Sequence, residues 1–139
     1  QLQLADAICA DRGKGLGTGR KWKALLWTSS GPSIIGPVPG GWFNTQDLLV
    51  FDSPLGPNGN DGGVARALLF ADGSAPSGAI PSYAWTGGPD KTQANCGNWS
   101  EVDASGAVGT TGAVEFYRWI GTALANCSLE LALYCFEQQ

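Results

Sequence analysis

Hydrophobic and polar positions alternate most regularly near the end of the chain, in residues 128–135. From Leu129 to Leu133 leucine occupies every second position, with Glu130 and Ala132 between. A period of two is typical of a strand with one buried face. The pattern therefore predicts a final β-strand over these residues.

Two cysteines, Cys127 and Cys135, flank this segment. A strand of that length separates their Cα atoms by about 26 Å, at roughly 3.3 Å per residue. A disulfide requires Cα atoms within about 7 Å, so these two cysteines do not pair with each other. Each must pair with Cys9 or Cys96, and two connectivities stay open. Either one joins the last strand to both the beginning and the late middle of the chain.

Apolar residues recur at helical spacing from Leu2 to Cys9, which predicts a short helix over residues 3–12. The glycine-rich run at 13–19 follows it. This run lacks the Gly-Lys-Ser/Thr ending of a phosphate-binding loop and the third glycine of a dinucleotide fingerprint. We interpret it as a helix stop and a turn. Residues 22–28 then predict a strand.

The middle of the chain predicts short elements between loops. A short helix is expected over residues 44–49, with Asn44 as its N-cap. Strands are expected at 64–71, 83–85 and 98–102, loops at 29–42 and 52–63, a turn at 72–73, and a flexible glycine-rich connection at 106–112. Short strands separated by irregular loops predict a loop-rich α+β fold. We expect one domain over residues 1–139.

Composition narrows the class of protein. A chain of 139 residues with 43% hydrophobic residues can bury a core, which argues against disorder. A net charge of −4, with only eight lysines and arginines, argues against a nucleic-acid partner. No stretch approaches the roughly 18 apolar residues of a spanning helix, so no membrane span is expected.

The four cysteines include no Cys-x-x-Cys pair, and the chain contains no histidine. This spacing favours two disulfides over a metal site, and hence an oxidising compartment. The chain begins with Gln1 and contains no methionine, which indicates a mature product whose export signal has been removed. We therefore expect a secreted or surface-displayed protein.

The absence of histidine removes the Ser-His-Asp and Cys-His arrangements of nucleophilic catalysis. Asp90, Glu101 and Asp103 are close enough in sequence to suggest the paired carboxylates of a glycosidase. Solvated loop charges are the preferred interpretation. We expect no enzyme activity.

Asn58, Asn60 and Asp61 offer clustered oxygen ligands of the type that calcium favours. The loop lacks the spaced glycine and the distal glutamate of an EF-hand, and one carboxylate is too few for tight binding. Plain Asn-Gly and Asp-Gly turns explain the residues better. We expect no metal and no cofactor.

Five of the six tryptophans divide into two groups. Trp27, Trp85 and Trp99 lie in strand-like segments and are expected in the core. Trp42 and Trp119 have weaker structural reasons, and an exposed tryptophan can stack on a sugar or anchor a protein partner. Core packing is still the preferred role for each.

Asn98-Trp-Ser100 and Asn126-Cys-Ser128 match the acceptor pattern for N-glycosylation. The pattern occurs often by chance and matters only where asparagine is glycosylated. Because Asn126 adjoins a disulfide cysteine, Asn98 is the better candidate of the two.

Several motifs follow one another in an order that resembles the C-type lectin-like fold, most closely its endostatin-like branch. The resemblance covers roughly residues 4–137, and the ending also resembles bacterial secreted and lipoprotein domains. The motifs are the segments 16–30, 47–49 and 65–73, then Trp85-Thr-Gly-Gly88, Cys96-Gly-Asn-Trp99 and Leu133-Tyr-Cys-Phe-Glu137.

The resemblance implies joined termini and two nested disulfides, Cys9–Cys135 and Cys96–Cys127. The chain lacks the Glu-Pro-Asn, Gln-Pro-Asp and Trp-Asn-Asp triplets with which sugar-binding C-type lectins hold calcium. It also lacks the histidines and the arginine-rich surface that endostatin uses for zinc and heparin. The resemblance therefore implies a fold and not a function.

We expect a secreted or surface-displayed binding module with a role in adhesion, which recognises an extracellular glycan or protein without calcium. The alternative is a structural subunit that assembles with copies of itself into an extracellular fibre or surface layer, since low charge and many aromatics suit self-packing. The partner surface is expected between residues 29 and 95, on loops held by a rigid scaffold. Within it Trp42, Asn60, Asp61 and Asp90 are the candidates for stacking and hydrogen bonding.

Overall fold

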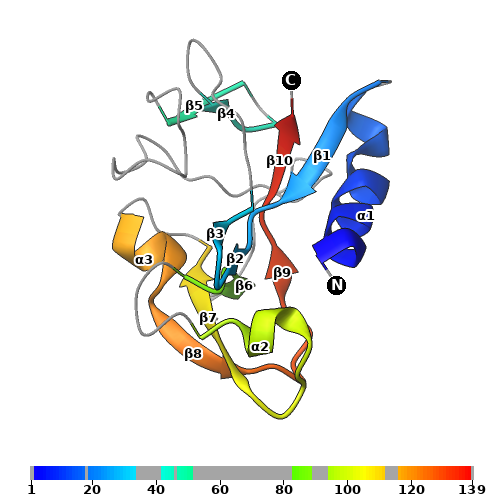
Figure 1. The fold of residues 1–139 in the computed structure, drawn as a ribbon. Coiled ribbons are helices and arrows are strands. Elements are labelled where there is room, and N and C mark those ends of the chain that lie inside the picture. The colour runs from blue at the N-terminus through cyan, green and yellow to red at the C-terminus, as the bar shows by residue number, and fades with distance from the viewer. Residues whose placement is uncertain are drawn as a thin grey trace.

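The computed structural model describes residues 2–17, 19–33, 42–45, 47–51, 83–88, 94–111 and 116–138. These residues form a mixed α+β fold with three short helices and several small sheets (Figure 1). The mixed class expected from the sequence is confirmed. None of the described helices is long and apolar enough to cross a membrane.

The elements are short and follow the chain in a fixed order. The helices are α1 (Leu2–Gly13), a 3-10 turn (Lys14–Leu16), α2 (Cys96–Trp99) and α3 (Phe116–Ile120). The strands are β1 (Lys21–Ala24), β2 (Trp27–Thr28), β3 (Gly31–Pro32), β4 (Trp42–Phe43), β5 (Leu49–Phe51), β6 (Tyr83–Trp85), β7 (Ser105–Thr110), β8 (Ala123–Asn126), β9 (Ala132–Leu133) and β10 (Cys135–Gln138).

Four small sheets connect these strands. The largest has the order β8-β7-β6-β9, in which only the β6–β9 pair is parallel. Strand β1 pairs with β10, β2 with β3, and β4 with β5, each antiparallel. The β1–β10 pair places residues 21–24 beside the C-terminal strand (Figure 1).

Helix α1 lies against this terminal pair of strands. The backbone N–H of Ala24 donates to Oδ1 of Asp6 at 2.9 Å, and the disulfide Cys9–Cys135 joins α1 to β10 with Cα atoms 5.4 Å apart. At the end of the helix, a Cβ on Gly13 would lie 2.3 Å from the Trp22 ring. The helix expected over residues 3–12 is confirmed, and glycine ends it where the strand comes closest.

Three central segments separate two hydrophobic cores. Along residues 24–27 every side chain is buried, and successive side chains enter opposite cores, as the pleat of an extended chain requires. The side chains of Ala84 and Trp85 likewise enter opposite cores, and so do successive side chains along residues 133–136. We call the two sides the aromatic core and the helix core. The aromatic core contains Leu25, Trp27, Trp42, Val50, Ala84, Trp119, Ile120 and Tyr134, and the helix core contains Ala5, Cys9, Ala24, Leu26, Trp85, Cys96 and Val108.

The helix expected over residues 44–49 is wrong. This segment connects β4 to β5 as a hairpin, in which the Asn44 N–H donates to the Leu48 carbonyl oxygen and the Leu48 N–H donates to Oδ1 of Asn44. Asp47 has a φ of 58°, which a right-handed helix does not allow. The asparagine caps a turn instead of a helix.

The flexible connection expected at residues 106–112 is also wrong, because residues 105–110 form β7, a central strand of the largest sheet. Its glycines allow close packing. A Cβ on Gly106 would lie 2.7 Å from Sγ of Cys96, and a Cβ on Gly109 would lie 1.6 Å from the carbonyl oxygen of Trp119. Real Cβ atoms do not approach other atoms so closely, so both positions require glycine.

Three further expectations concern strands. The strand at 83–85 is confirmed as β6, whereas the strand at 22–28 divides into β1 and β2 around Leu25 and Leu26. The final strand begins only at Ala132 and is interrupted at Tyr134, and residues 98–102 form no strand. The segments 52–63, 64–71 and 72–73 lie outside the described residues.

Candidate functional site

Of the four residues proposed from the sequence as a partner surface, the structure describes Trp42. Asn60, Asp61 and Asp90 lie outside the described residues. Trp42 is only 7% exposed and packs edge-on against Phe136, with ring centroids 5.4 Å apart. This burial agrees with the core role preferred for each tryptophan and leaves little of the ring for stacking on a ligand.

Trp119 is likewise buried, with its ring stacked on that of Tyr134 at 4.5 Å. The Tyr134 hydroxyl donates to the Trp119 carbonyl oxygen at 3.3 Å. Burial raises the pKa of Tyr134 well above its ordinary value of 10.0. Trp42 and Trp119 are therefore both core residues of the fold, although their surroundings in the sequence offered weaker reasons for a structural role.

An open apolar groove of about 210 Å³ lies elsewhere, between α1 and the segment that follows α2. One wall is α1, with Leu4 and Ile8, and the opposite wall includes Val102. Among these, Leu4 is 67% exposed and Val102 is 63% exposed. The floor is formed by Trp85, Leu133 and the disulfide cysteines 96 and 127. Leu133 of this lining belongs to β9, which lies between α1 and α2 in Figure 1.

The exposure of α1 follows from which of its apolar residues face inward. Ala5 and Cys9 are buried one turn apart, and the Cys9 sulfur is bonded to β10. Small inward residues let the helix pack closely on β1. Leu4 and Ile8 each precede a buried residue by one position, about 100° around the helix, and so face the groove. A helix that exposes its larger apolar side chains is a feature typical of interaction surfaces.

This surface differs from the one expected from the sequence, which lay on the loops between residues 29 and 95. A signal was available in the chain. A disulfide to the last strand fixes Cys9 inward, and the helical period then directs Leu4 and Ile8 away from Cys9.

The other end of the groove depends on an unusual backbone turn. All four residues of α2 have positive φ angles, 53° at Cys96, 58° at Gly97, 56° at Asn98 and 67° at Trp99. They therefore form a left-handed turn. For residues other than glycine this conformation costs roughly 1–2 kcal/mol each, although asparagine tolerates it better.

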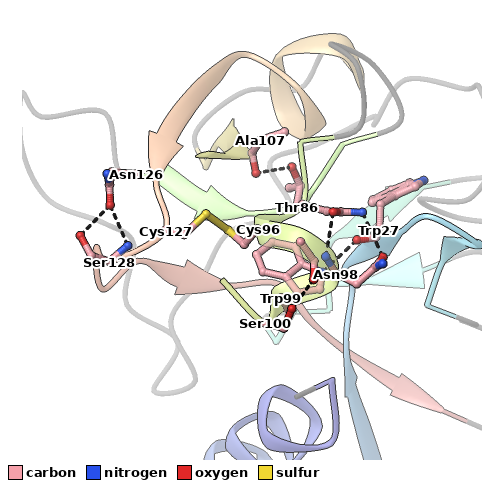
Figure 2. Close-up of a disulfide and its surroundings, with 12 residues drawn as sticks. Trp27, Thr86, Cys96, Asn98, Trp99, Ser100, Ala107, Asn126, Cys127 and Ser128 are labelled. Atoms are coloured by element: carbon pink, nitrogen blue, oxygen red, sulfur yellow. Dashed lines mark hydrogen bonds between the residues drawn. A yellow bond between two sulfur atoms is a disulfide. The ribbon is translucent and has the colours of Figure 1, made fainter. Parts of the chain in front are cut away.

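Several interactions hold this turn in place. The Asn98 N–H donates to Oδ1 of Asn95 at 3.0 Å, and the Ser29 N–H donates to Oδ1 of Asn98 at 2.8 Å. The Trp99 indole N–H donates to the Trp27 carbonyl at 2.9 Å. The disulfide Cys96–Cys127 fastens the turn to the residue after β8 (Figure 2).

The two disulfides are thus Cys9–Cys135 and Cys96–Cys127. This is the nested pairing that the resemblance implied. It is also one of the two connectivities that the strand geometry left open.

The motif Trp85-Thr-Gly-Gly88 has a structural role beneath the groove. Thr86 is fully buried, and its hydroxyl lies within hydrogen-bonding distance of the carbonyl oxygens of Ala107 and Ile120. Gly87 has a φ of 67°, and a Cβ there would lie 2.8 Å from the Trp99 ring. The motif packs β6 against β7, α2 and α3.

Both candidate glycosylation sites are exposed, on opposite sides of the Cys96–Cys127 disulfide in Figure 2. Oδ1 of Asn126 accepts bonds from the backbone N–H and the hydroxyl of Ser128. Asn98 lies inside the left-handed turn, and its Oδ1 accepts a bond from the Ser29 N–H. Each asparagine therefore has a structural role, and its glycosylation stays a prediction.

Among the described residues, the lining of the groove contains one charged side chain, that of Glu101, and Asp103 is exposed two positions further along the chain. On α1 the exposed Arg12 follows Ile8 by one helical turn, so a basic side chain comes next on that face of the helix. Asp6 accepts a hydrogen bond from the backbone of β1. A hydrogen bond and ion pair with Lys14 lower the pKa of Asp11. Glu101 and Asp103, by contrast, are exposed beside Val102.

The described residues offer few groups suited to metal binding or catalysis. Within the described ranges, no three Asp, Glu, Cys or His residues are grouped as metal ligands would be. Of the three carboxylates considered for glycoside hydrolysis, Asp90 is outside those ranges, and Glu101 and Asp103 are exposed.

Comparisons with protein families, curated proteins and solved structures found no match to this chain. The function proposed below is therefore inferred from the residues of the groove itself.

Proposed function

We propose that this protein is a secreted or surface-displayed binding module that recognises an extracellular protein through the groove between α1 and α2. The observation that carries the proposal is the exposure of Leu4, Ile8 and Val102 around an apolar floor. Two disulfides suit an oxidising, extracellular compartment. A C-type lectin-like fold remains part of the proposal.

The chemistry of the groove favours a protein partner over a glycan. Sugar recognition needs several convergent polar groups, usually beside an exposed aromatic face. In the groove the Ser100 hydroxyl already donates to the carbonyl oxygen of Gly97, and the other polar side chain of the lining is Glu101. Apolar walls instead suit the aliphatic or aromatic anchors of a protein interface.

The test is a binding screen against extracellular matrix and cell-surface proteins, with a glycan array in parallel. The double variant Leu4→Gln/Val102→Gln makes both walls polar at exposed positions, so the fold should persist. Leu124→Gln is the matched control, because Leu124 is 55% exposed on β8 and does not line the groove. We expect protein binding that the double variant loses and the control keeps.

Glycan binding that both variants retain would contradict the proposal. Self-assembly into a fibre or surface layer is the alternative function, and no described contact favours it. Light scattering of the same three proteins separates the two functions. Large regular particles from the wild type would support the structural subunit, whereas a monomer or small oligomer fits the binding module.

A further inference from the structure

We infer that the groove accepts a basic peptide segment with an apolar anchor. One or two apolar side chains of the partner would enter between Leu4 and Val102, and neighbouring lysine or arginine residues would lie beside Glu101 and Asp103. This inference rests on the proposed function and names the chemistry of the partner.

The first support is electrostatic. Among the described residues that line the groove, Glu101 is the only charged one, and Asp103 lies exposed two positions beyond it. Five of the eight lysines and arginines fall between Arg12 and Lys23, and of these Arg12 lies one helical turn beyond Ile8 on α1. The wall at Glu101 and Asp103 therefore attracts cationic side chains.

Glu101 is the best-placed rim charge. It lines the groove, is exposed, and makes no ion pair or side-chain hydrogen bond with any described residue. Asp103 lies two residues further along the same exposed segment. Neither carboxylate is neutralised within the described part of the molecule, so both are available to a cationic partner.

The second support is the size and lining of the groove. Its volume of about 210 Å³ is below the roughly 300–1,000 Å³ of typical small-molecule sites. A site of this size suits one or two inserted side chains. The floor combines the Trp85 and Trp99 rings, which meet edge to face at 5.8 Å, with the disulfide sulfurs. Aliphatic, methionine and aromatic anchors all pack well on such a surface.

The third support is the rigidity of the acidic wall. Glu101 lies two residues after the left-handed turn, and its backbone N–H donates to the Cys96 carbonyl at 2.9 Å. The disulfide, the Asn98 bonds and the Trp99 indole bond hold that turn. A wall ordered before binding lowers the entropy cost of association.

The experiment is a selection of short random peptides, displayed on phage, against the wild-type protein. Counter-selection against Leu4→Gln/Val102→Gln retains only sequences that need the groove. We expect the retained peptides to combine an aliphatic or aromatic residue with adjacent lysine or arginine. Synthetic versions are then titrated at 0.1 M and 1 M salt, between which the Debye length falls from about 10 Å to about 3 Å.

The matched charge variants are Glu101→Gln/Asp103→Asn and the control Asp47→Asn, an exposed carboxylate in the β4–β5 hairpin. At low salt the double variant should weaken binding of the selected peptides by about three- to tenfold, and the control should not. At 1 M salt the difference should nearly vanish.

Retained peptides that are acidic or uncharged, or binding that ignores the double charge variant, would overturn the inference. Failure to obtain any groove-dependent peptide would overturn it as well. None of these three results decides the proposed function. The protein panel and the Leu124→Gln control test that function separately.

Discussion

The two disulfides fasten regions of very different construction. Cys9–Cys135 spans 126 residues of sequence and joins a regular helix to a regular strand pair, α1 to β1 and β10. Cys96–Cys127 spans 31 residues and holds a left-handed turn against the end of the β7–β8 strand pair. The first region is stable by ordinary secondary structure. The second contains strained backbone and needs its crosslink and side-chain bonds to keep its shape.

The groove lies where these two regions meet, with α1 as one wall and the segment after α2 as the other. The comparison suggests a division of roles. The long disulfide region supplies stability and a fixed helix, and the short disulfide region supplies the shape and charge of the opposite wall. Each prediction below separates these two contributions.

Removal of the long disulfide should have the largest effect on stability. In the loop-entropy description, a crosslink over 126 residues stabilises the fold by about 5 kcal/mol. We expect Cys9→Ala/Cys135→Ala to lower the free energy of unfolding by about that amount, measured by urea denaturation. A loss below about 1 kcal/mol would show that the packing of α1 on β1 is sufficient without the crosslink.

Removal of the short disulfide should cost slightly less stability but more function. The same description gives about 4 kcal/mol for 31 residues. In Cys96→Ala/Cys127→Ala the left-handed turn loses its fastening, so the wall that carries Glu101 should become mobile. We expect groove-dependent peptide binding to fall at least tenfold at a temperature where circular dichroism shows the variant folded.

The control for that experiment is Cys9→Ala/Cys135→Ala at a temperature of equal folded fraction. It should retain more peptide binding than the short-disulfide variant. Equal losses in the two variants would contradict the proposed division between stability and shape.

The same contrast explains which parts of the fold were predictable from sequence. The helix at residues 3–12 follows from the helical spacing of its apolar residues, and the structure confirms it. The alternating leucines of residues 128–135 predicted a continuous strand, whereas the structure has β9 from Ala132 and β10 from Cys135, with an interruption at Tyr134. The helix expected from Asn44 failed because asparagine caps turns as readily as helices. A local period was therefore sufficient for the helix but did not determine the bounds of the strand.

Around the short disulfide no local pattern determined the structure. Cys96-Gly-Asn-Trp99 gives no period, and its left-handed form depends on bonds to Ser29 and Trp27, about 70 residues earlier. The glycines of β7 suggested flexibility, whereas contacts with the Trp119 backbone and the Cys96 sulfur require them. The groove as a whole was not predictable from local pattern, because only the tertiary fold brings α1 opposite the segment after α2.

Glycine substitutions test how far each region can adjust. A Cβ at Gly109 would meet the Trp119 backbone at 1.6 Å, so Gly109→Ala should cost about 3 kcal/mol, at the upper end for overpacking. At Gly13 the Cβ would meet the Trp22 side chain, which is partly exposed and can move. Because alanine also favours the helix, Gly13→Ala should cost only about 1 kcal/mol.

Gly15→Ala is the control for both, because a Cβ there would meet no atom within 4 Å. It should change the free energy of unfolding by no more than about 0.5 kcal/mol. Urea denaturation of the three variants gives the comparison. A larger loss at Gly13 than at Gly109 would mean that the helix packing, and not β7, is the less adjustable region.

The smallest predicted effect is a pH dependence in the long disulfide region. Burial raises the pKa of Tyr134, so the native state keeps the phenol proton that the unfolded chain releases near pH 10. The unfolded state then binds fewer protons than the native state, and stability must fall as pH rises above 10. The slope for one group is about 1.4 kcal/mol per pH unit, and below pH 9 this residue should contribute no slope.

Tyr134→Phe loses a 3.3 Å hydrogen bond to the Trp119 carbonyl, which should cost about 1 kcal/mol at neutral pH. It should also remove this part of the alkaline slope, measured by urea denaturation between pH 8 and 11. If the variant and the wild type lose stability equally over that range, Tyr134 is not the group responsible, and the aromatic core admits more water than its burial indicates.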